Sequence, residues 1–336
     1  MLEHSRSLKK YLPWGITVIV SFAAGTALGA GMLILQPTTT PSHNGEGEIR
    51  EGNSSYPLIN PLLECDLGSD RLGVNHPKPK REDVTAVIEK AKQEKQIASA
   101  SVYYRDLNNG PWMGIDEREK FLPASLLKVP IMMYFYKQAE QNPSLLDRMV
   151  MLEGNVTPTE QHFNPRETVK PGTPYRVGDL VERSIRHSDN GAAEALVSIA
   201  TPFFLDKLLD TLHVSYVADA EGDFITVRDY ATFFRVLFNA SYLNDEWSNA
   251  ALDLLTRVEF NQGIPAGLPP SIPVAHKFGE AFRDDTKEKQ LHDCGIVYLP
   301  NQPYVLCIMT RGTDLDVQAG VIAKISQVVF ETVSQP

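Results

Sequence analysis

The chain of 336 residues is 43% hydrophobic and 22% charged, and 42 acidic residues against 32 basic ones give a formal net charge of −10. This balance excludes a disordered chain and a polytopic membrane protein, and the acidic excess excludes a nucleic-acid binder, which needs a basic surface. Three cysteines cannot form a fully paired framework, and eight scattered histidines contain no metal-binding motif, so we expect neither a disulfide-stapled scaffold nor a metal site.

An uncharged apolar segment, residues 14–35, lies close to the N-terminus. At about 1.5 Å per residue, a helix of this length crosses the roughly 30 Å hydrocarbon core of a bilayer. Basic residues precede the segment, so the positive-inside rule places residues 1–13 in the cytoplasm and the chain after residue 36 outside. We expect an uncleaved signal-anchor that crosses the cell membrane once. The small residues of Ala27-Leu28-Gly29 leave a cleaved signal peptide as the alternative.

A polar stretch, residues 36–55, follows this segment and contains a single hydrophobic residue, Ile49. Such a stretch cannot bury enough apolar surface to offset the entropy lost on ordering, so it is predicted to be a flexible linker. Apolar residues return at Tyr56. Residues 56–336 are therefore predicted to form one soluble domain on the extracytoplasmic side.

The domain is predicted to begin with a helix and a β-hairpin. Val84, Val87, Ile88 and Ala91 recur at helical spacing, and residues 97–106 and 112–115 read as strands around the turn signal Asn108-Asn109-Gly110. Periodicity then predicts helices over 125–138, 177–187, 192–199, 203–212, 226–239 and 245–258. Strands are predicted over 274–278, 291–299 and 304–311, followed by a closing amphipathic helix that contains residues 321–329.

This order of elements predicts an α+β fold. Strands near both ends of the domain form one antiparallel sheet, and the helical middle forms a second lobe against it. A cleft between sheet and lobe is the expected place for a functional site.

The motif Ser125-Leu-Leu-Lys128 stands where a polar linker gives way to an apolar helix. Residues three apart share a helix face, so the lysine amine can reach the serine hydroxyl. A serine at a helix N-terminus also places its own N–H group beside a developing negative charge. Alone, this pattern is more typical of a helix cap next to a solvated lysine than of a catalytic pair.

Two further motifs follow in order: Ser188-Asp189-Asn190 in a predicted turn between helices, and Lys277-Phe278-Gly279 on a predicted strand. Serine-x-x-lysine, serine-aspartate-asparagine and lysine-threonine-glycine form the motif set of penicillin-recognising enzymes. From about residue 80 to its C-terminus, the chain resembles the class A β-lactamase group of serine hydrolases, which is related to the penicillin-binding D,D-peptidases. The resemblance implies a β-lactamase/transpeptidase-like fold, with a five-stranded antiparallel sheet flanked by terminal helices and an all-helical lobe.

The resemblance also implies a role for each motif residue, with no metal and no organic cofactor. Ser125 is expected to be the nucleophile that forms an acyl-enzyme, and Lys128 is expected to accept its proton. Ser188 would relay a proton to the leaving nitrogen. Asn190 would hold the substrate amide, and Lys277 would attract a substrate carboxylate. The oxyanion hole would use the backbone N–H groups of Ser125 and of Glu280, which follows Gly279.

Two departures from the family pattern bear on activity. Phe278 replaces the usual hydroxyl residue, which removes one hydrogen bond to a substrate carboxylate. No E-x-x-L-N motif lies between Asn190 and Lys277, although this motif normally supplies the glutamate that activates the deacylating water. Glu221 lies in the corresponding part of the chain but in a different local sequence, and we expect it to be an exposed loop residue.

Two cysteines lie on the predicted hairpin near the C-terminus. Pairing Leu299 with Tyr304 would make Cys294 and Cys307 diagonal neighbours, so free buried thiols are at least as compatible with the sequence as a disulfide. His276 precedes Lys277. It reads either as a substrate contact or, more in keeping with a residue in a strand, as a structural histidine.

The sequence therefore predicts a membrane-tethered, extracytoplasmic serine hydrolase that opens β-lactam rings through an acyl-enzyme. A D,D-carboxypeptidase acting on cell-wall peptides is the alternative of the same chemistry. A slow-turnover penicillin sensor or cell-wall-binding module is the alternative of another class. The expected partners are a small-molecule or peptide substrate and the membrane, with no nucleic acid and no metal.

Overall fold

The structure is a computed structural model that describes residues 56–61, 77–108, 111–151, 161–163, 168–219, 222–283 and 286–335. The predicted anchor at 14–35 and the linker at 36–55 lie outside these residues. No helix within the described ranges is both long and apolar enough to span a bilayer.

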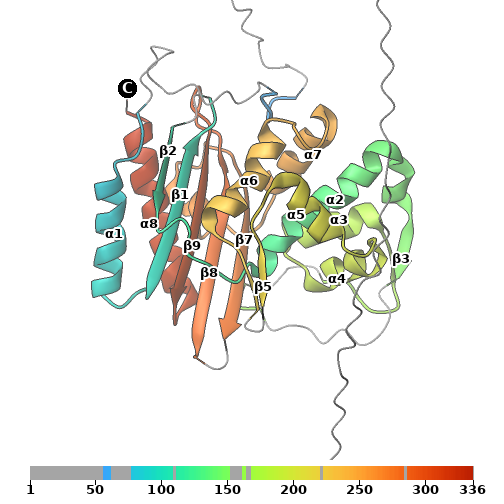
Figure 1. The fold of residues 1–336 in the computed structure, drawn as a ribbon, viewed down its shortest axis with the longest axis horizontal. Coiled ribbons are helices and arrows are strands. Elements are labelled where there is room, and N and C mark those ends of the chain that lie inside the picture. Colours follow the sequence, from blue (N-terminus) through green and yellow to red (C-terminus); the bar gives the residue numbers. More distant parts are fainter. Residues whose placement is uncertain are drawn as a thin grey trace, which may run out of the picture. The chain divides into compact units, whose positions relative to one another are not determined.

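A five-stranded antiparallel sheet forms the centre of the domain (Figure 1). Strand β1 pairs with β9 along its whole length, so the two ends of the domain meet in one sheet, as predicted. The strands lie in the order β2-β1-β9-β8-β7, with bounds β1 Ser99–Asp106, β2 Trp112–Ile115, β7 Val274–Arg283, β8 Glu288–Val297 and β9 Tyr304–Gly312.

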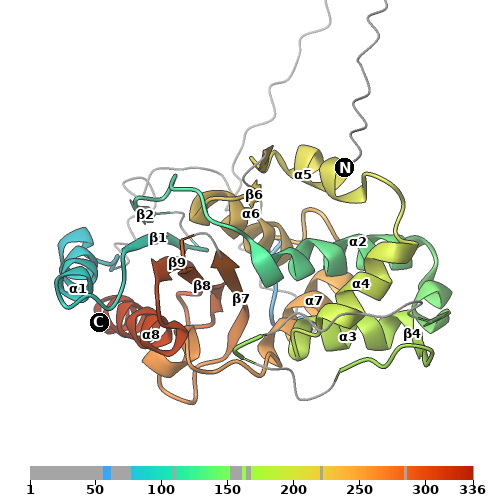
Figure 2. The ribbon, with the colours of Figure 1, turned by 90° about the horizontal axis from the view of Figure 1, so that it is seen from below.

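Helices cover both faces of the sheet (Figure 2). The terminal helices α1 (Arg81–Gln93) and α8 (Leu315–Val333) lie on one face, and the helices of the middle of the chain lie on the other. This confirms the predicted fold. The second group is α2 Lys128–Gln141, α3 Val177–Arg186, α4 Asn190–Ile199, α5 Phe204–Leu212, α6 Val227–Phe238 and α7 Asp245–Thr256.

The helical lobe also contains short elements that the sequence patterns do not predict. Two small hairpins are built from β3 (Met149–Met151) with β4 (Pro174–Arg176) and from β5 (Val217–Asp219) with β6 (Gly222–Phe224). The lobe is therefore not entirely helical. Strands of three residues carry too little alternation to be recognised from sequence.

Two hydrophobic cores result, one on each face of the sheet. Cross-strand partners share a face, so Lys277, Cys294, Cys307 and Tyr103 all face the helical lobe, where the last three belong to the larger core. Phe278 points to the opposite face and packs in the smaller core under α1 and α8. Successive residues of β7 thus serve different faces, and this alternation positions Lys277.

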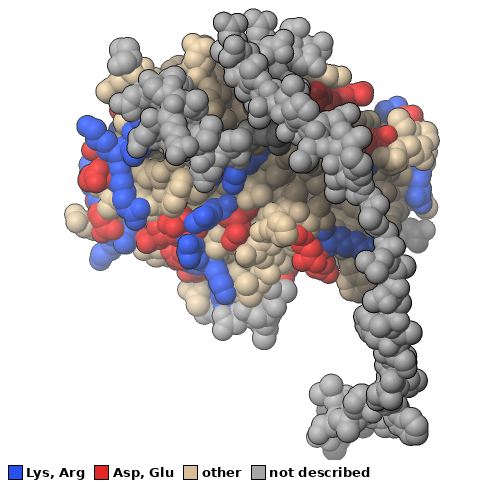
Figure 3. Space-filling model, turned by 45° about the horizontal axis from the view of Figure 1, so that its top comes forward, with Lys and Arg blue, Asp and Glu red and all other residues tan. Residues whose placement is uncertain are grey.

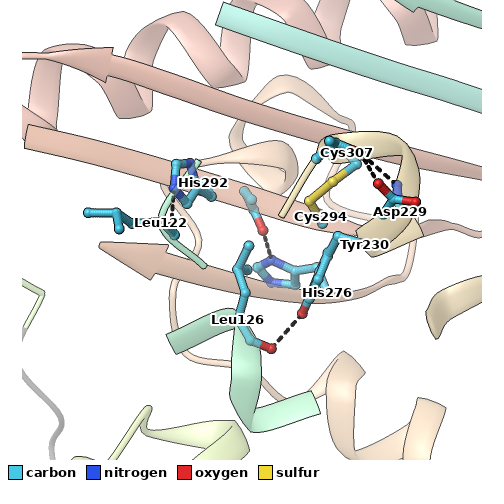
Figure 4. Close-up of a disulfide and its surroundings, with 10 residues drawn as sticks. Leu122, Leu126, Asp229, Tyr230, His276, His292, Cys294 and Cys307 are labelled. Atoms are coloured by element: carbon cyan, nitrogen blue, oxygen red, sulfur yellow. Dashed lines mark hydrogen bonds and ion pairs between the residues drawn. A yellow bond between two sulfur atoms is a disulfide. The ribbon is translucent and has the colours of Figure 1, made fainter. Parts of the chain in front are cut away.

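Cys294 and Cys307 lie directly opposite each other on β8 and β9 and form a disulfide (Figure 4). The predicted register of this hairpin is wrong by two residues, because Val297 and not Leu299 pairs with Tyr304. Leu299 belongs to the turn, where its carbonyl accepts a backbone hydrogen bond that closes the connection. Once the strand ends at Val297, the two cysteines come into register.

The charged side chains of the described residues are of both signs. On the face drawn in Figure 3, lysine and arginine side chains lie among aspartate and glutamate side chains. The acidic excess of the sequence is therefore not gathered into one field on the part of this face that the structure describes.

Candidate active site

Ser125 lies on a 3₁₀ turn, Ala124–Leu127, that leads directly into α2. The sequence predicts one continuous helix here, and the structure instead tightens its first turn. Ala124 has a φ of 47°, in the left-handed region that a residue with a Cβ atom rarely adopts. Tyr230 of α6 holds the turn from the lobe, because its hydroxyl donates to the Leu126 carbonyl at 2.9 Å (Figure 4). The nucleophile candidate thus stands on a strained and firmly held turn.

Lys128 is the centre of the site. Its Nζ lies 2.9 Å from Ser125 Oγ and 2.6 Å from Asn190 Oδ1. It also lies 2.7 Å from the Ser188 carbonyl oxygen and 3.2 Å from Ser188 Oγ. The first two motifs, 60 residues apart in sequence between Lys128 and Ser188, therefore converge on one amine.

Burial lowers the pKa of Lys128 to about 7, against the weaker opposing attraction of the Asp189 and Glu280 carboxylates. Its side chain is only 4% exposed, so the charged ammonium has lost most of its hydration. A lysine with this pKa is substantially neutral near pH 7 and can accept the proton of Ser125. The main cause of the lowered pKa is desolvation.

The turn at 188–190 is held from inside by Asp189. Oδ1 of this carboxylate caps α4 by accepting from the backbone N–H groups of Gly191 at 2.9 Å and Ala192 at 3.3 Å, and Oδ2 accepts from the backbone N–H of Val169 at 2.7 Å. Ser188, with a φ of 55°, adopts the left-handed conformation. Asp189 therefore stabilises the turn, while its neighbours Ser188 and Asn190 contact Lys128.

Lys277 meets the site from the sheet. Its Nζ donates to Ser188 Oγ at 3.0 Å and to the Phe278 carbonyl at 2.9 Å, and it lies 4.1 Å from the centre of the Phe278 ring. The side chain is 0% exposed. Burial, followed by repulsion from Lys128, lowers the pKa of Lys277 well below its usual value. Ser188 Oγ thus lies between two lysines, which suits a proton relay.

Gly279 lets the edge strand approach the nucleophile turn. A Cβ atom on this residue would lie 3.0 Å from the Pro123 carbonyl oxygen and 3.1 Å from the Leu126 nitrogen, both backbone atoms. Strand β7 is an edge strand, so alternate backbone N–H groups have no strand partner on that side. The close approach brings the backbone of Glu280 to the Ser125 turn, as an oxyanion hole requires.

His292 supports this turn from β8, a contact that sequence reasoning missed. Its Nε2 donates to the Leu122 carbonyl at 2.9 Å (Figure 4). Gln290 Oε1 accepts from the Leu122 N–H at 3.0 Å. Burial lowers the pKa of His292 to about 4, so the ring is neutral near pH 7. The available signal was its place opposite Gly279 on the neighbouring strand, which only the correct register reveals.

A cleft of about 390 Å³ opens over Ser125 and Lys128. Asn190 and Glu280 also line it, whereas Ser188 and Lys277 lie below its surface. Sequence reasoning did not single out the other lining residues, most of which lie within or beside the motifs on the same elements, with Gln161 from a separate segment. These are Ala124, Leu127, Ile131, Gln161, Ala193, Ala281 and Phe282.

Two other candidates behave differently. His276 is buried and its Nδ1 lies 2.8 Å from Asp293 Oδ1, so it has the structural role that the strand position favours. Glu221 lies outside the described residues. Within those residues, the hydrogen bonds of Lys128 go to serine and asparagine and none goes to a carboxylate. No three histidine, cysteine, aspartate or glutamate side chains converge there as metal ligands would.

Comparisons with known proteins agree with this geometry. Residues 79–333 match the model of the β-lactamase enzyme family. Among solved structures, the fold is similar to that of a PBP-A mutant in an acyl-enzyme complex with penicillin G, with a TM-score of 0.63 and 21% identity over 77% of this chain and 98% of that chain. It is also similar to a β-lactamase from Sphaerobacter thermophilus, with a TM-score of 0.64 and 18% identity over 76% of this chain and 97% of that chain.

A class A β-lactamase from Mycobacterium abscessus gives a TM-score of 0.62 and 21% identity over 74% of this chain and 97% of that chain. A search of curated proteins finds no match. At these identities the solved structures establish the shared fold, while the family match spans more than half of the sequence. The chain therefore belongs to the β-lactamase enzyme family and is a serine hydrolase.

Proposed function

We propose that this enzyme opens β-lactam rings by forming an acyl-enzyme at Ser125, and that it releases the acyl group slowly. The observation that carries the proposal is the pair formed by Ser125 Oγ and Lys128 Nζ, 2.9 Å apart, in which the lysine has a pKa of about 7. A general base must lie within about 3.2 Å of the heavy atom whose proton it takes, and its pKa must lie near the working pH.

Acylation then follows from the positions of the side chains. Neutral Lys128 takes the hydroxyl proton as Ser125 Oγ attacks the lactam carbonyl carbon. The backbone N–H groups of Ser125 and Glu280 stabilise the oxyanion. When the intermediate collapses, the C–N bond breaks and the ring nitrogen needs a proton. Ser188 Oγ, 3.2 Å from Lys128 Nζ and 3.0 Å from Lys277 Nζ, donates its proton to the nitrogen and receives one from Lys128.

Deacylation requires a water molecule and a base that activates it. Besides Lys128, the cleft is lined by the apolar side chains of Leu127, Ile131 and Ala193 and by the carboxylate of Glu280. Both oxygens of this carboxylate accept hydrogen bonds from the backbone N–H groups of His162 and Phe163, so it is not placed as a dedicated base for a water molecule. General-base assistance is worth about 10²–10⁴-fold, so a site without a dedicated carboxylate should lose its acyl group more slowly by about this factor. Among the described residues, Lys128 is the base whose amine lies within hydrogen-bonding distance of Ser125 Oγ, so it is the candidate for this step.

The same observation favours a second candidate, a D,D-peptidase that acts on cell-wall peptides. Such an enzyme needs acylation by Ser125 and Lys128 and has no requirement for rapid lactam hydrolysis. PBP-A, whose fold is similar, is described in an acyl-enzyme complex with penicillin G. A penicillin sensor with very slow turnover would share the same first step.

We further propose that residues 14–35 tether the enzyme to the cell membrane with its catalytic domain outside the cytoplasm. Support comes from the uncharged segment and from the basic residues Arg6, Lys9 and Lys10 that precede it. A reporter that is active only outside the cytoplasm should work when fused after Ser55. Activity of a cytoplasm-only reporter at that point would reverse the topology.

Intact-mass spectrometry of the purified enzyme with benzylpenicillin tests the chemistry. We expect an adduct of the mass of the penicillin that forms faster than it disappears, and no adduct in Ser125→Ala. Ser198→Ala, on the neighbouring helix α4, is the matched control and should label like the wild type. Labelling of Ser125→Ala would contradict the nucleophile, and an adduct too short-lived to accumulate would contradict slow release.

A further inference from the structure

The side chain of Glu280 lies at the end of the cleft nearest to Lys277, where it lines the cavity while only 9% exposed. Its Oε1 accepts from the backbone N–H of His162 at 2.9 Å, and its Oε2 accepts from that of Phe163 at 3.3 Å. One carboxylate thus binds two successive amides of a segment that lies 117 residues away in sequence. Burial raises the pKa of Glu280, and these two hydrogen bonds oppose the shift.

Further contacts hold the segment Gln161–Phe163 in place. The Phe163 ring packs edge-on against Phe260 at 4.8 Å and against Phe278 at 6.0 Å. Gln161 Nε2 donates to the Ser188 carbonyl at 3.3 Å. Phe278, at the position where the family has a hydroxyl residue, is therefore part of the aromatic cluster that anchors this segment.

The consequence is that Lys277 has no access to the cleft. It is 0% exposed, and its ammonium group is bound by Ser188 Oγ, the Phe278 carbonyl and the face of the Phe278 ring. The carboxylate of Glu280 lines the cleft, whereas Lys277 does not, so a ligand in the cleft can contact the former and not the latter. Like charges at short range in a partly desolvated site repel strongly, so a negatively charged ligand group is disfavoured there.

We propose that the Glu280 side chain determines substrate specificity by excluding a carboxylate from the Lys277 end of the cleft. The enzyme therefore prefers acyl donors that are uncharged at this position, or that present a hydrogen-bond donor to Glu280. This inference rests on the proposed function, because it concerns the substrates that acylate Ser125. Within the β-lactams, it predicts a preference for compounds whose carboxylate is masked.

A matched pair of probes tests the proposal: benzylpenicillin and its methyl ester, which differ in the charge of one group. Second-order rate constants for acylation of Ser125 are measured by intact mass for the wild type and for Glu280→Gln. We expect the wild type to react at least tenfold faster with the ester. Glu280→Gln, which keeps the size and removes the charge, should reduce this ester-to-acid ratio at least fivefold.

Asp316→Asn is the control, because Asp316 Oδ2 lies 2.9 Å from His162 Nε2 and belongs to the same contact region, but its carboxylate is exposed and does not line the cleft. Its ratio should stay within twofold of the wild-type ratio. Thermal melting of each variant checks that the fold is kept, and Glu280→Ala provides a second removal of the charge.

The proposal is overturned if the wild type reacts faster with benzylpenicillin than with its ester, or if neither Glu280 variant changes the ratio by fivefold. Failure of the proposed function looks different. In that case neither compound acylates Ser125 in the wild type, and this inference falls together with the function on which it rests.

Discussion

Two buried lysines contact the same serine, one lining the cleft and one below its surface, and the comparison between them shows what separates a base from a supporting cation. Lys128 and Lys277 both contact Ser188 Oγ, at 3.2 and 3.0 Å, and burial lowers the pKa of both. Lys128 lines the cleft and touches Ser125, whereas Lys277 is fully buried and its ammonium group contacts Ser188 Oγ, the Phe278 carbonyl and the Phe278 ring.

Desolvation alone therefore does not assign a role to a lysine. Both amines are poor at holding a proton, but only Lys128 has a hydroxyl within reach that can become a nucleophile. Lys277 acts on the reaction through Ser188 Oγ, so we regard it as a positioning residue. Lys277 differs from Lys128 in its surroundings, where Glu280 and the aromatic cluster around Phe278 bind the segment Gln161–Phe163.

Removing the amine of Lys128, the lysine that lines the cleft, should have the largest effect on the rate of acylation. Lys128→Met is expected to slow acylation by the methyl ester of benzylpenicillin by about 10²–10⁴-fold, because general-base assistance is lost. Rates are measured by intact mass. Lys137→Met, a more exposed lysine of the same helix, serves as the control and should change the rate less than twofold. Acylation by Lys128→Met within threefold of the wild type would assign the base elsewhere.

The disulfide lies directly beside the buried lysine Lys277, because Cys294 is the cross-strand partner of Lys277 on β8. Replacing both cysteines by alanine should lower the free energy of unfolding by about 3 kcal/mol, the expected effect of opening a loop of this size in the unfolded chain. The sequence separation of the two cysteines is 13 residues. Chemical denaturation measures the change, and a loss below about 1 kcal/mol would show that the link contributes little.

Gly279 allows strand β7, which carries Lys277, to approach the turn that carries Ser125. Gly279→Ala should therefore lower the free energy of unfolding by about 1–3 kcal/mol. The added Cβ would meet backbone atoms of Pro123 and Leu126, which cannot yield as a flexible side chain would. Acylation should slow as well, because β7 moves away from the Ser125 turn. Gly320→Ala in α8 is the matched control: no atom lies within 4 Å of its added Cβ, and a gain of about 0.5–1 kcal/mol is expected there. Equal stability of the two alanine variants would refute the requirement for close approach.

Lys277→Met should have the smallest effect on acylation by the ester, a loss of about five- to tenfold. This loss corresponds to one hydrogen bond worth about 1 kcal/mol, namely the bond from Lys277 Nζ to Ser188 Oγ. The same mass assay gives the rate. A loss as large as that of Lys128→Met would show that the two lysines are not as different as their surroundings imply.

The sequence predicts the fold well where its patterns are local. The helical faces and alternating strands lead to the helices α1 to α8 and to the central sheet, because each pattern reports burial within one element. The register of β8 and β9 was wrong, because the residues of the turn, Leu299 among them, are fixed by hydrogen bonds that composition does not reveal.

The site follows the same rule. The order of the motifs and the family resemblance that they carry bring Ser125, Lys128 and Ser188 into one predicted site, and the structure places both serines within hydrogen-bonding distance of Lys128. The motifs do not reveal that Phe278 points away from the helical lobe into an aromatic cluster or that Glu280 binds the segment Gln161–Phe163. The contacts that Phe278 and Glu280 make with the segment Gln161–Phe163 join residues more than a hundred positions apart.

The dependence of acylation on pH tests the central claim, that Lys128 acts as a neutral base, most directly. The methyl ester of benzylpenicillin is used because it carries no carboxylate for Glu280 to repel. With the pKa of Lys128 at about 7, the neutral fraction falls tenfold for each pH unit below that value and is nearly complete above it. The rate constant should therefore rise about tenfold per unit up to about pH 7 and then level off. A rate that is constant between about pH 5 and 9, or one that still rises tenfold per unit above about pH 9, would contradict the account.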